Sequence, residues 1–176
     1  MIRRGRAFAR DERGVTAIEF GILALPFFTI IFAILETAMM FFASQVLDSA
    51  VEDASRMIRT GQAQSAGYGL SNFRTLMCGY TFNLFGDCSG IKIQVKVISN
   101  FSSASTSPSV ETCTETTCTW TVTENFSAGT GRQVVQVSAF YRWPLLVVLP
   151  YFNLKNQPDN YRLFSATRVF RNEPFK

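Results

Sequence analysis

The fold is decided by the stretch at residues 18–42, IEFGILALPFFTIIFAILETAMMFF. A helix of about 20 predominantly apolar residues crosses the hydrocarbon core of a bilayer, and this stretch is long enough to do so. A removable secretory signal would have an apolar core of about 7–15 residues followed by a small-residue cleavage site, and neither feature occurs here. A buried core helix is the other alternative, and the arginines before the stretch argue against it. The residues of the stretch that fall outside the apolar set are Glu19, Gly21, Pro26, Thr29, Glu36 and Thr37.

The positive charge of the chain is concentrated before this stretch. Residues 1–14 hold five arginines against one aspartate and one glutamate, which accounts for most of the formal net charge of +4. Basic residues on one flank of a spanning helix favour a cytoplasmic N-terminus, so we expect a single-pass protein whose bulk lies beyond the membrane. The remaining residues carry no basic stripe, and we therefore expect no nucleic acid among the partners.

Catalytic chemistry finds little support in the composition. The 176 residues contain no histidine, which removes the Ser-His and Cys-His nucleophile pairs and the commonest zinc ligand. The carboxylates of residues 61–176 do not cluster in sequence as a metal-binding loop or a catalytic carboxylate pair. We therefore expect no enzyme, no cofactor, no metal site and no small-molecule substrate, and a membrane-bound hydrolase is the weakest alternative.

Helical periodicity continues beyond the apolar stretch but changes character. Apolar residues recur at helical spacing through residues 43–60, charged residues take the other faces, and Gly61 supplies a stop signal. We predict one helix over residues 16–60, about 67 Å long at 1.5 Å per residue. Its first half is apolar all round, its second half needs a sheet to cover one stripe, and Pro26 is expected to kink or loosen it. The stripe comprises Val46, Leu47, Ala50, Val51, Ala54, Met57 and Ile58.

The rest of the chain, residues 61–176, has the pattern of a small α+β head. It begins with a short predicted helix at residues 70–76, and strands follow from alternating or β-branched segments. The turn at residues 128–131 predicts a hairpin between the second and third strands. Residues 144–152, PLLVVLPYF, are too few to span a bilayer and are expected to form a buried or interfacial loop or short helix. The predicted strands are residues 91–97, 117–125, 132–143 and 161–170.

The four cysteines form two pairs that are close in sequence. An even number of cysteines in an exported domain favours disulfides, although four cysteines allow three connectivities. Proximity favours the pairs Cys78–Cys88 and Cys113–Cys118. A zinc site built from all four thiolates is the rival interpretation, but the sequence contains no C-x2-C pair.

The residues at the start of the predicted helix resemble a processing signal. The octapeptide RGVTAIEF, residues 13–20, is similar to the signal of type IV pilins and in particular to that of the tight-adherence (Tad) pilus proteins. In that family a prepilin peptidase cuts after a glycine. The resemblance assigns Gly14 to the residue before the cut, Val15 to the new N-terminus, Glu19 to the glutamate and Phe20 to the aromatic residue that follows it.

The C-terminal third extends the resemblance to one branch of this system. Residues 132–152 and the closing ATRVFRNEPF, residues 166–175, look like the corresponding parts of TadE-type pseudopilins. The resemblance implies a pilin-like α+β fold, in which a long N-terminal helix packs on a small antiparallel sheet of about four strands. It divides the chain into a cytoplasmic leader (1–14), a transmembrane part of the helix (15–42), a periplasmic extension of the helix (43–60) and a periplasmic head (61–176).

The function that the resemblance implies is structural. We expect a membrane-anchored pseudopilin or minor pilin that takes part in assembly or initiation of a Tad-type adhesion pilus, in the bacterial inner membrane and at the pilus base or tip. Its expected partners are the inner membrane, the prepilin peptidase, other pilins and pseudopilins, and the Tad inner-membrane platform. The alternative is a permanently anchored periplasmic assembly or scaffold factor of the same machinery that never enters the filament.

Two carboxylates within the apolar stretch bear on how subunits pack. A charged side chain inside an apolar helix is costly and requires a partner. In an assembled bundle, the new α-amine of Val15 in one subunit is expected to pair with Glu19 of its neighbour, so that neither charge lies alone in hydrocarbon. We expect Glu19, Pro26 and Glu36 at the packing surface between subunits, although a solvated position near the outer interface is equally compatible with the sequence for Glu36.

Overall fold

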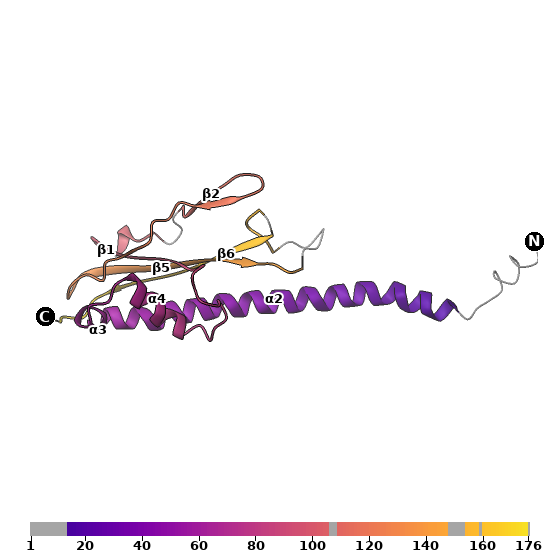
Figure 1. The fold of residues 1–176 in the computed structure, drawn as a ribbon, viewed down its shortest axis with the longest axis horizontal. Helices are drawn as coiled ribbons and strands as arrows, with labels where there is room; N and C mark the ends of the chain where they lie inside the picture. Colours follow the sequence, from indigo (N-terminus) through magenta and orange to yellow (C-terminus); the bar gives the residue numbers. More distant parts are fainter. Residues whose placement is uncertain (1–13, 106–108, 148–153, 159, 176) are drawn as a thin grey trace, which may run out of the picture.

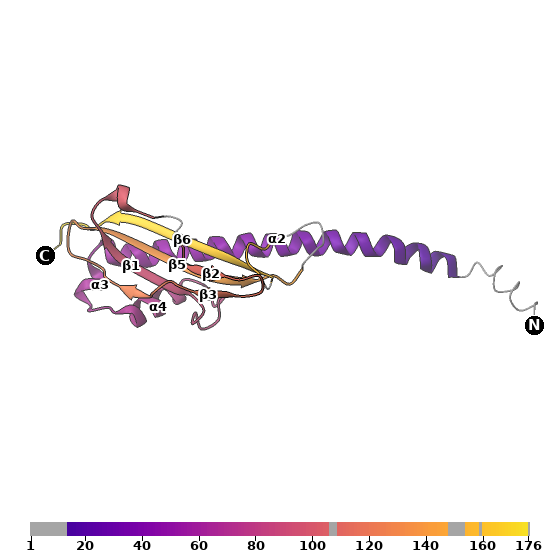
Figure 2. The same ribbon diagram turned by 90° about the horizontal axis from the view of Figure 1, so that it is seen from above.

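A single long helix, α2 (Val15–Arg59), carries a small α+β head on its C-terminal half. The computed structural model describes residues 14–105, 109–147, 154–158 and 160–175, so most of the predicted leader lies outside the described residues. Two short helices, α3 (Gln62–Ser65) and α4 (Leu70–Gly79), follow α2 directly. Figures 1 and 2 both show the N-terminal half of α2 extending well beyond the head. The expected helix at residues 16–60 is thus confirmed, with its ends shifted by one residue.

The head is built on a four-stranded sheet with the strand order β4-β1-β5-β6. The two long strands, β5 (Val134–Pro144) and β6 (Tyr161–Arg171), pair antiparallel along their whole length, from Val134 opposite Arg171 to Pro144 opposite Tyr161. Strand β1 (Lys92–Ile98) is antiparallel to β5, and the two-residue β4 (Asn125–Phe126) is parallel to β1. The expected pilin-like α+β fold is confirmed, except that one short strand pair of the sheet is parallel.

The expected hairpin between residues 117–125 and 132–143 is wrong. Strand β3 (Cys118–Trp120) instead pairs with β2 (Glu111–Cys113) in a separate two-stranded sheet. Figure 1 shows β2 on the side of the four-stranded sheet opposite α2. Both edges of β5 are already occupied by β1 and β6, which leaves no edge for β3. A local turn favours the observed pairing, because the Thr114 N–H donates to the Thr117 carbonyl at 2.8 Å.

The core lies between the C-terminal half of α2 and one face of the sheet. Alternate residues of β5, Val135, Val137 and Ala139, belong to the same buried cluster as the apolar stripe of α2. Burial of this apolar surface supplies the main driving force for docking the sheet on the helix. Met57 is half-buried, whereas the other predicted members of the stripe are buried. The buried apolar residues of α2 are Met40, Ala43, Val46, Leu47, Ala50, Val51, Ala54 and Ile58.

The C-terminal end of α2 is fixed by a glycine and by the end of the chain. Gly61 takes a left-handed conformation with φ +81°, which glycine adopts without strain, and its N–H donates to the Ile58 carbonyl at 3.1 Å. The Glu173 N–H donates to the Arg59 carbonyl at 2.9 Å, and the Phe175 ring lies where a side chain at position 61 would be. The predicted stop at Gly61 is therefore confirmed, and the C-terminal segment closes over it.

The N-terminal half of α2 lies outside this core. Among the described residues, α2 is the one helix long and apolar enough to cross a membrane, with a mean hydropathy of 2.4 over its most apolar window and none of that window buried. The helix continues without interruption through Pro26, whose missing N–H leaves one helical hydrogen bond unmade. One turn away, the Thr29 hydroxyl donates to the Leu25 carbonyl at 2.7 Å.

Candidate functional site: the N-terminal half of α2 and its junction with the head

The predicted processing residues stand at the exposed start of α2. Gly14 is the N-cap residue of the helix and Val15 its first residue, and Phe20 is 68% exposed. A side chain at Gly14 would meet no atom within 4 Å, and the same holds at Gly21. Among the described residues none therefore covers Gly14, and a change of residue there need not disturb the described fold.

Glu19 lies on the same helical face as Val15, four residues along the chain. Its side chain is exposed, and it forms no ion pair within the described residues. Pro26 lies on the same protruding half of the helix. Both residues are thus placed where a lipid bilayer or a neighbouring helix has access to them.

Glu36, unlike Glu19, is covered by the head of the same chain. Glu36 is 7% exposed, and the backbone N–H of Leu146 donates to its Oε1 atom at 3.1 Å. Leu146 follows the end of β5, so this hydrogen bond joins residues 110 positions apart in sequence. It fixes the end of β5 at the level of Glu36 on α2.

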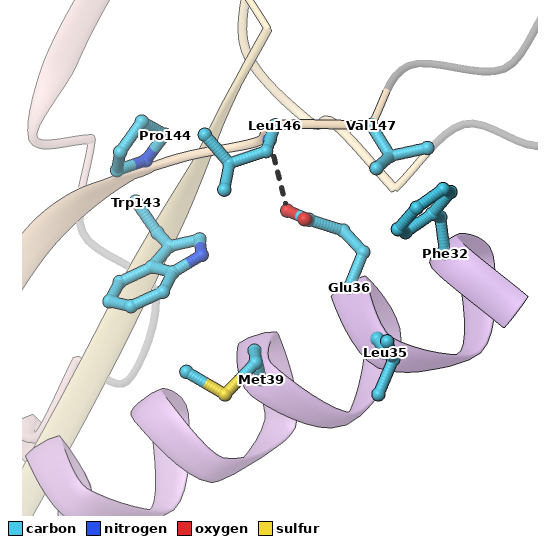
Figure 3. A pocket seen from close by; sticks show the side chains of 8 residues that line it. All are labelled: Phe32, Leu35, Glu36, Met39, Trp143, Pro144, Leu146 and Val147. Carbon is cyan, nitrogen blue, oxygen red and sulfur yellow. Dashed lines mark hydrogen bonds between the residues drawn. The ribbon is translucent and has the colours of Figure 1, made fainter.

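Beside this contact, α2 and the end of β5 enclose a groove of about 420 Å³ (Figure 3). Its walls are apolar apart from Glu36, whose carboxylate points across the groove toward Leu146. Leu146 is 88% exposed, and the helix residues opposite it are about half exposed. The described lining residues are Phe32, Leu35, Glu36, Met39, Trp143, Pro144, Leu146 and Val147.

Aromatic residues hold the groove wall formed by β5 in place. The ring of Trp143 stacks on that of Phe164 at 5.7 Å, and Phe85 makes an edge contact with Tyr141 at 4.8 Å. Burial raises the pKa of Tyr141, and electrostatic interaction with Tyr161 and Asp87 raises it further. The strand aromatics therefore pack against one another and leave only part of Trp143 facing the groove.

Two disulfides stabilise the loops of the head. Cys78 is bonded to Cys88, and Cys113 to Cys118 across the turn between β2 and β3. In the described part of the chain, Glu111, Cys113 and Cys118 form a cluster with the spacing of a metal site. Because the two sulfur atoms are bonded to each other, the cluster offers a single free ligand, the Glu111 carboxylate. That carboxylate accepts a hydrogen bond of 2.6 Å from Arg142 Nε.

Two ion-pair networks tie distant segments together. Arg168 of β6 reaches Asp48 and Glu52, one turn apart on α2, with Nη2 2.6 Å from Asp48 Oδ2. Glu124, just before β4, accepts bonds from Arg74 Nη2 at 2.6 Å and from the Ile93 N–H at 3.0 Å. Burial disfavours the charged form of Glu124, but these two donors outweigh that effect and lower its pKa.

Sequence reasoning missed the contacts made by Glu36 and Arg168. The i,i+4 spacing of Asp48 and Glu52 was an available signal for Arg168, since two carboxylates on one helical face attract a cation from elsewhere. No local pattern pointed to the pairing of Glu36 with the Leu146 backbone.

Comparison with known protein families finds a match that lies within the long helix. Residues 14–56 match the family described as TadE-like protein, so the match begins at the N-cap residue of α2 and ends in its last turns. No curated protein and no solved structure matches the chain. This family match agrees with the resemblance inferred from residues 13–20. Over residues 14–56, which lie in its long helix, the chain is therefore similar to the TadE-like family.

Proposed function

We propose that this protein is a membrane-anchored pseudopilin or minor pilin that takes part in the assembly or initiation of a Tad-type adhesion pilus. A prepilin peptidase removes residues 1–14, and the N-terminal half of α2 holds the protein in the inner membrane with the head in the periplasm. The observation that carries the proposal is the TadE-like match from residue 14 onward, over a helix whose N-terminal half protrudes bare from the head.

The exposed surface of α2 supports this proposal. Apolar side chains face outward all round the helix, so no one-sided contact with a soluble partner would cover them. A bilayer covers such a surface before assembly, and neighbouring pilin helices cover it afterwards. The bare residues include Ile18, Phe20, Ile22, Leu23, Leu25, Phe27, Ile30 and Ile34.

Glu19 has a specific role in this proposal. Cleavage after Gly14 creates a charged amine at Val15, and in the filament this amine pairs with Glu19 of the next subunit. The exposure of Glu19 and its lack of an ion pair among the described residues leave it available for that contact. Replacing Glu19 by alanine is expected to permit membrane insertion but to reduce piliation.

The experiment that tests the proposal is the fractionation of sheared pili from cells that produce the tagged protein. A subunit is recovered with the filaments, whereas the same protein carrying Glu19→Ala is expected to remain in the membrane fraction. The matched control is Thr29→Ala, a polar-to-alanine change on the same protruding helix. Recovery of the wild-type protein in the membrane alone would instead favour the permanently anchored assembly factor, and normal piliation with Glu19→Ala would exclude the amine–carboxylate pairing.

A further inference from the structure

The groove between α2 and the end of β5 lies at a defined depth if α2 crosses the membrane. From Ile18 to Glu36 the helix rises by about 27 Å, at 1.5 Å per residue. The hydrocarbon core of a bilayer is about 30 Å thick. With Ile18 at the cytoplasmic boundary of the core, Glu36 therefore reaches its outer boundary.

The hydrogen bond from Leu146 to Glu36 brings the head to this same depth. The antiparallel pairing of β5 with β6 places Pro144 and Tyr161 at the end of the sheet nearest the protruding helix, and Val134 at the far end. Leu146 extends beyond that near end and is 88% exposed. An exposed apolar side chain is costly in water but favourable in the outer leaflet.

The residues around the groove suit the boundary between lipid and water. Trp143 lines the groove, and tryptophan is enriched at this level of membranes because its ring is apolar and its N–H polar. A carboxylate is tolerated near the boundary more readily than at the bilayer centre, and the Leu146 N–H satisfies one oxygen of Glu36. The remaining walls are apolar and continuous with the bare surface of α2.

We propose that this groove holds an acyl chain of a phospholipid from the outer leaflet, so that the membrane-facing end of the head rests in the bilayer surface. The inference rests on the membrane anchoring in the proposed function. Lipid is the occupant because acyl chains surround this part of α2 before any other subunit joins. The volume of about 420 Å³ lies within the range of about 300–1,000 Å³ common for small-molecule sites.

The two tryptophans of the chain allow a direct test. A Trp120→Phe variant keeps Trp143 as the single reporter in the groove, and a Trp143→Phe variant keeps Trp120, which lies on β3 under Arg142. The full-length proteins are reconstituted in vesicles of phosphatidylethanolamine and phosphatidylglycerol, with bromine on the acyl chains near the headgroup. Trp143, which lines the groove, is expected to lose more of its fluorescence than Trp120, which lies at a similar level in the two-stranded sheet on the side away from α2.

A substitution in the groove then separates lipid contact from general membrane proximity. In the Trp143 reporter, Leu146→Asp places a charge against hydrocarbon and is expected to bring the quenching of Trp143 down to the level of Trp120. The matched control is Phe101→Asp. Phe101 is 56% exposed and follows β1 at the end of the sheet far from the protruding helix, so quenching should not change.

Flotation of the protein with the vesicles reports anchoring independently of quenching, so failure of the lipid site alone can be told apart from failure of the proposed function. A protein that floats but whose Trp143 is not quenched would keep its anchoring and overturn the lipid site. Protection of Trp143 from aqueous iodide that grows with the protein concentration in the vesicles, without quenching by bromine, would assign the groove to a second copy of the chain instead. Failure to float would overturn the anchoring and the lipid site together. The comparison of Trp143 with Trp120 needs no change in the groove, so misfolding of Leu146→Asp does not prevent the test.

Discussion

Replacing Leu47 by alanine is expected to destabilise the head strongly, whereas the same change at Leu25 is expected to leave its stability unchanged. The two leucines lie on one helix but in different surroundings, since Leu47 is 1% exposed and Leu25 is 72% exposed. Removing a buried leucine side chain costs the lost transfer free energy and leaves a cavity, together about 3 kcal/mol. At Leu25 there is no packed surface of the head to lose.

The measurement is urea unfolding of the full-length protein in a nonionic detergent. A Trp120→Phe background makes Trp143, which stacks on Phe164 in the head, the single fluorescent reporter. A loss of about 3 kcal/mol lowers the unfolding midpoint by about 1.5 M urea for a slope near 2 kcal/mol/M. Leu25→Ala should shift it by less than about 0.3 M. Equal shifts for the two variants would refute the division of α2 into a core half and a bare half.

Three further predictions concern the contacts that hold the head together. Arg168→Met should lower the free energy of unfolding by only about 1 kcal/mol, because Asp48 and Glu52 are more than a third exposed and solvent screens both ion pairs. The same urea titration should show a smaller loss in high salt. The pKa of Glu124 is lower in the folded chain than in the unfolded chain, so its stabilising effect is present above pH about 4.3 and is lost as the pH falls through the folded value. Glu124→Gln should therefore flatten the dependence of the urea midpoint on pH below about 5, and an unchanged pH profile would contradict the assigned contacts. Replacing Cys78 and Cys88 together by serine should lower the free energy of unfolding by about 3 kcal/mol on the loop-entropy estimate. The same change at Cys113 and Cys118, which close a shorter loop, should lower it by about 2 kcal/mol. The variant without the Cys78–Cys88 bond should therefore have the lower melting temperature.

The elements with a clear period were predictable from the sequence. The helical spacing from Val46 to Ile58 predicted that α2 continues beyond the apolar stretch, and it predicted the face that the sheet covers. Strict alternation at residues 91–97 predicted a half-buried strand, which β1 is: Ile93 and Val95 are buried, whereas Val97 near its end is 37% exposed. In each case a single face of one element carries the signal, and no knowledge of its neighbours is needed.

Pairing between distant segments was not predictable in the same way. The turn residues at 128–131 favoured a hairpin with β5, but β5 is paired on both edges by strands that lie farther away in sequence. The contact between Glu36 and the Leu146 backbone depends on where the sheet comes to rest along α2. Such contacts are set by packing of the whole head, and a backbone donor leaves no mark in the residue pattern.

The central claim is that the chain is trimmed after Gly14 and retained in the membrane by the rest of α2. The intact mass of protein extracted from membranes, without reduction, tests it most directly. The expected mass is that of a chain beginning at Val15, less two hydrogens for each of the two disulfides. Gly14→Leu should keep the leader, whereas the control Gly21→Leu, where a side chain also meets open space, should be trimmed normally. A full-length mass for the wild-type protein in the membrane, or normal trimming of Gly14→Leu, would contradict the account.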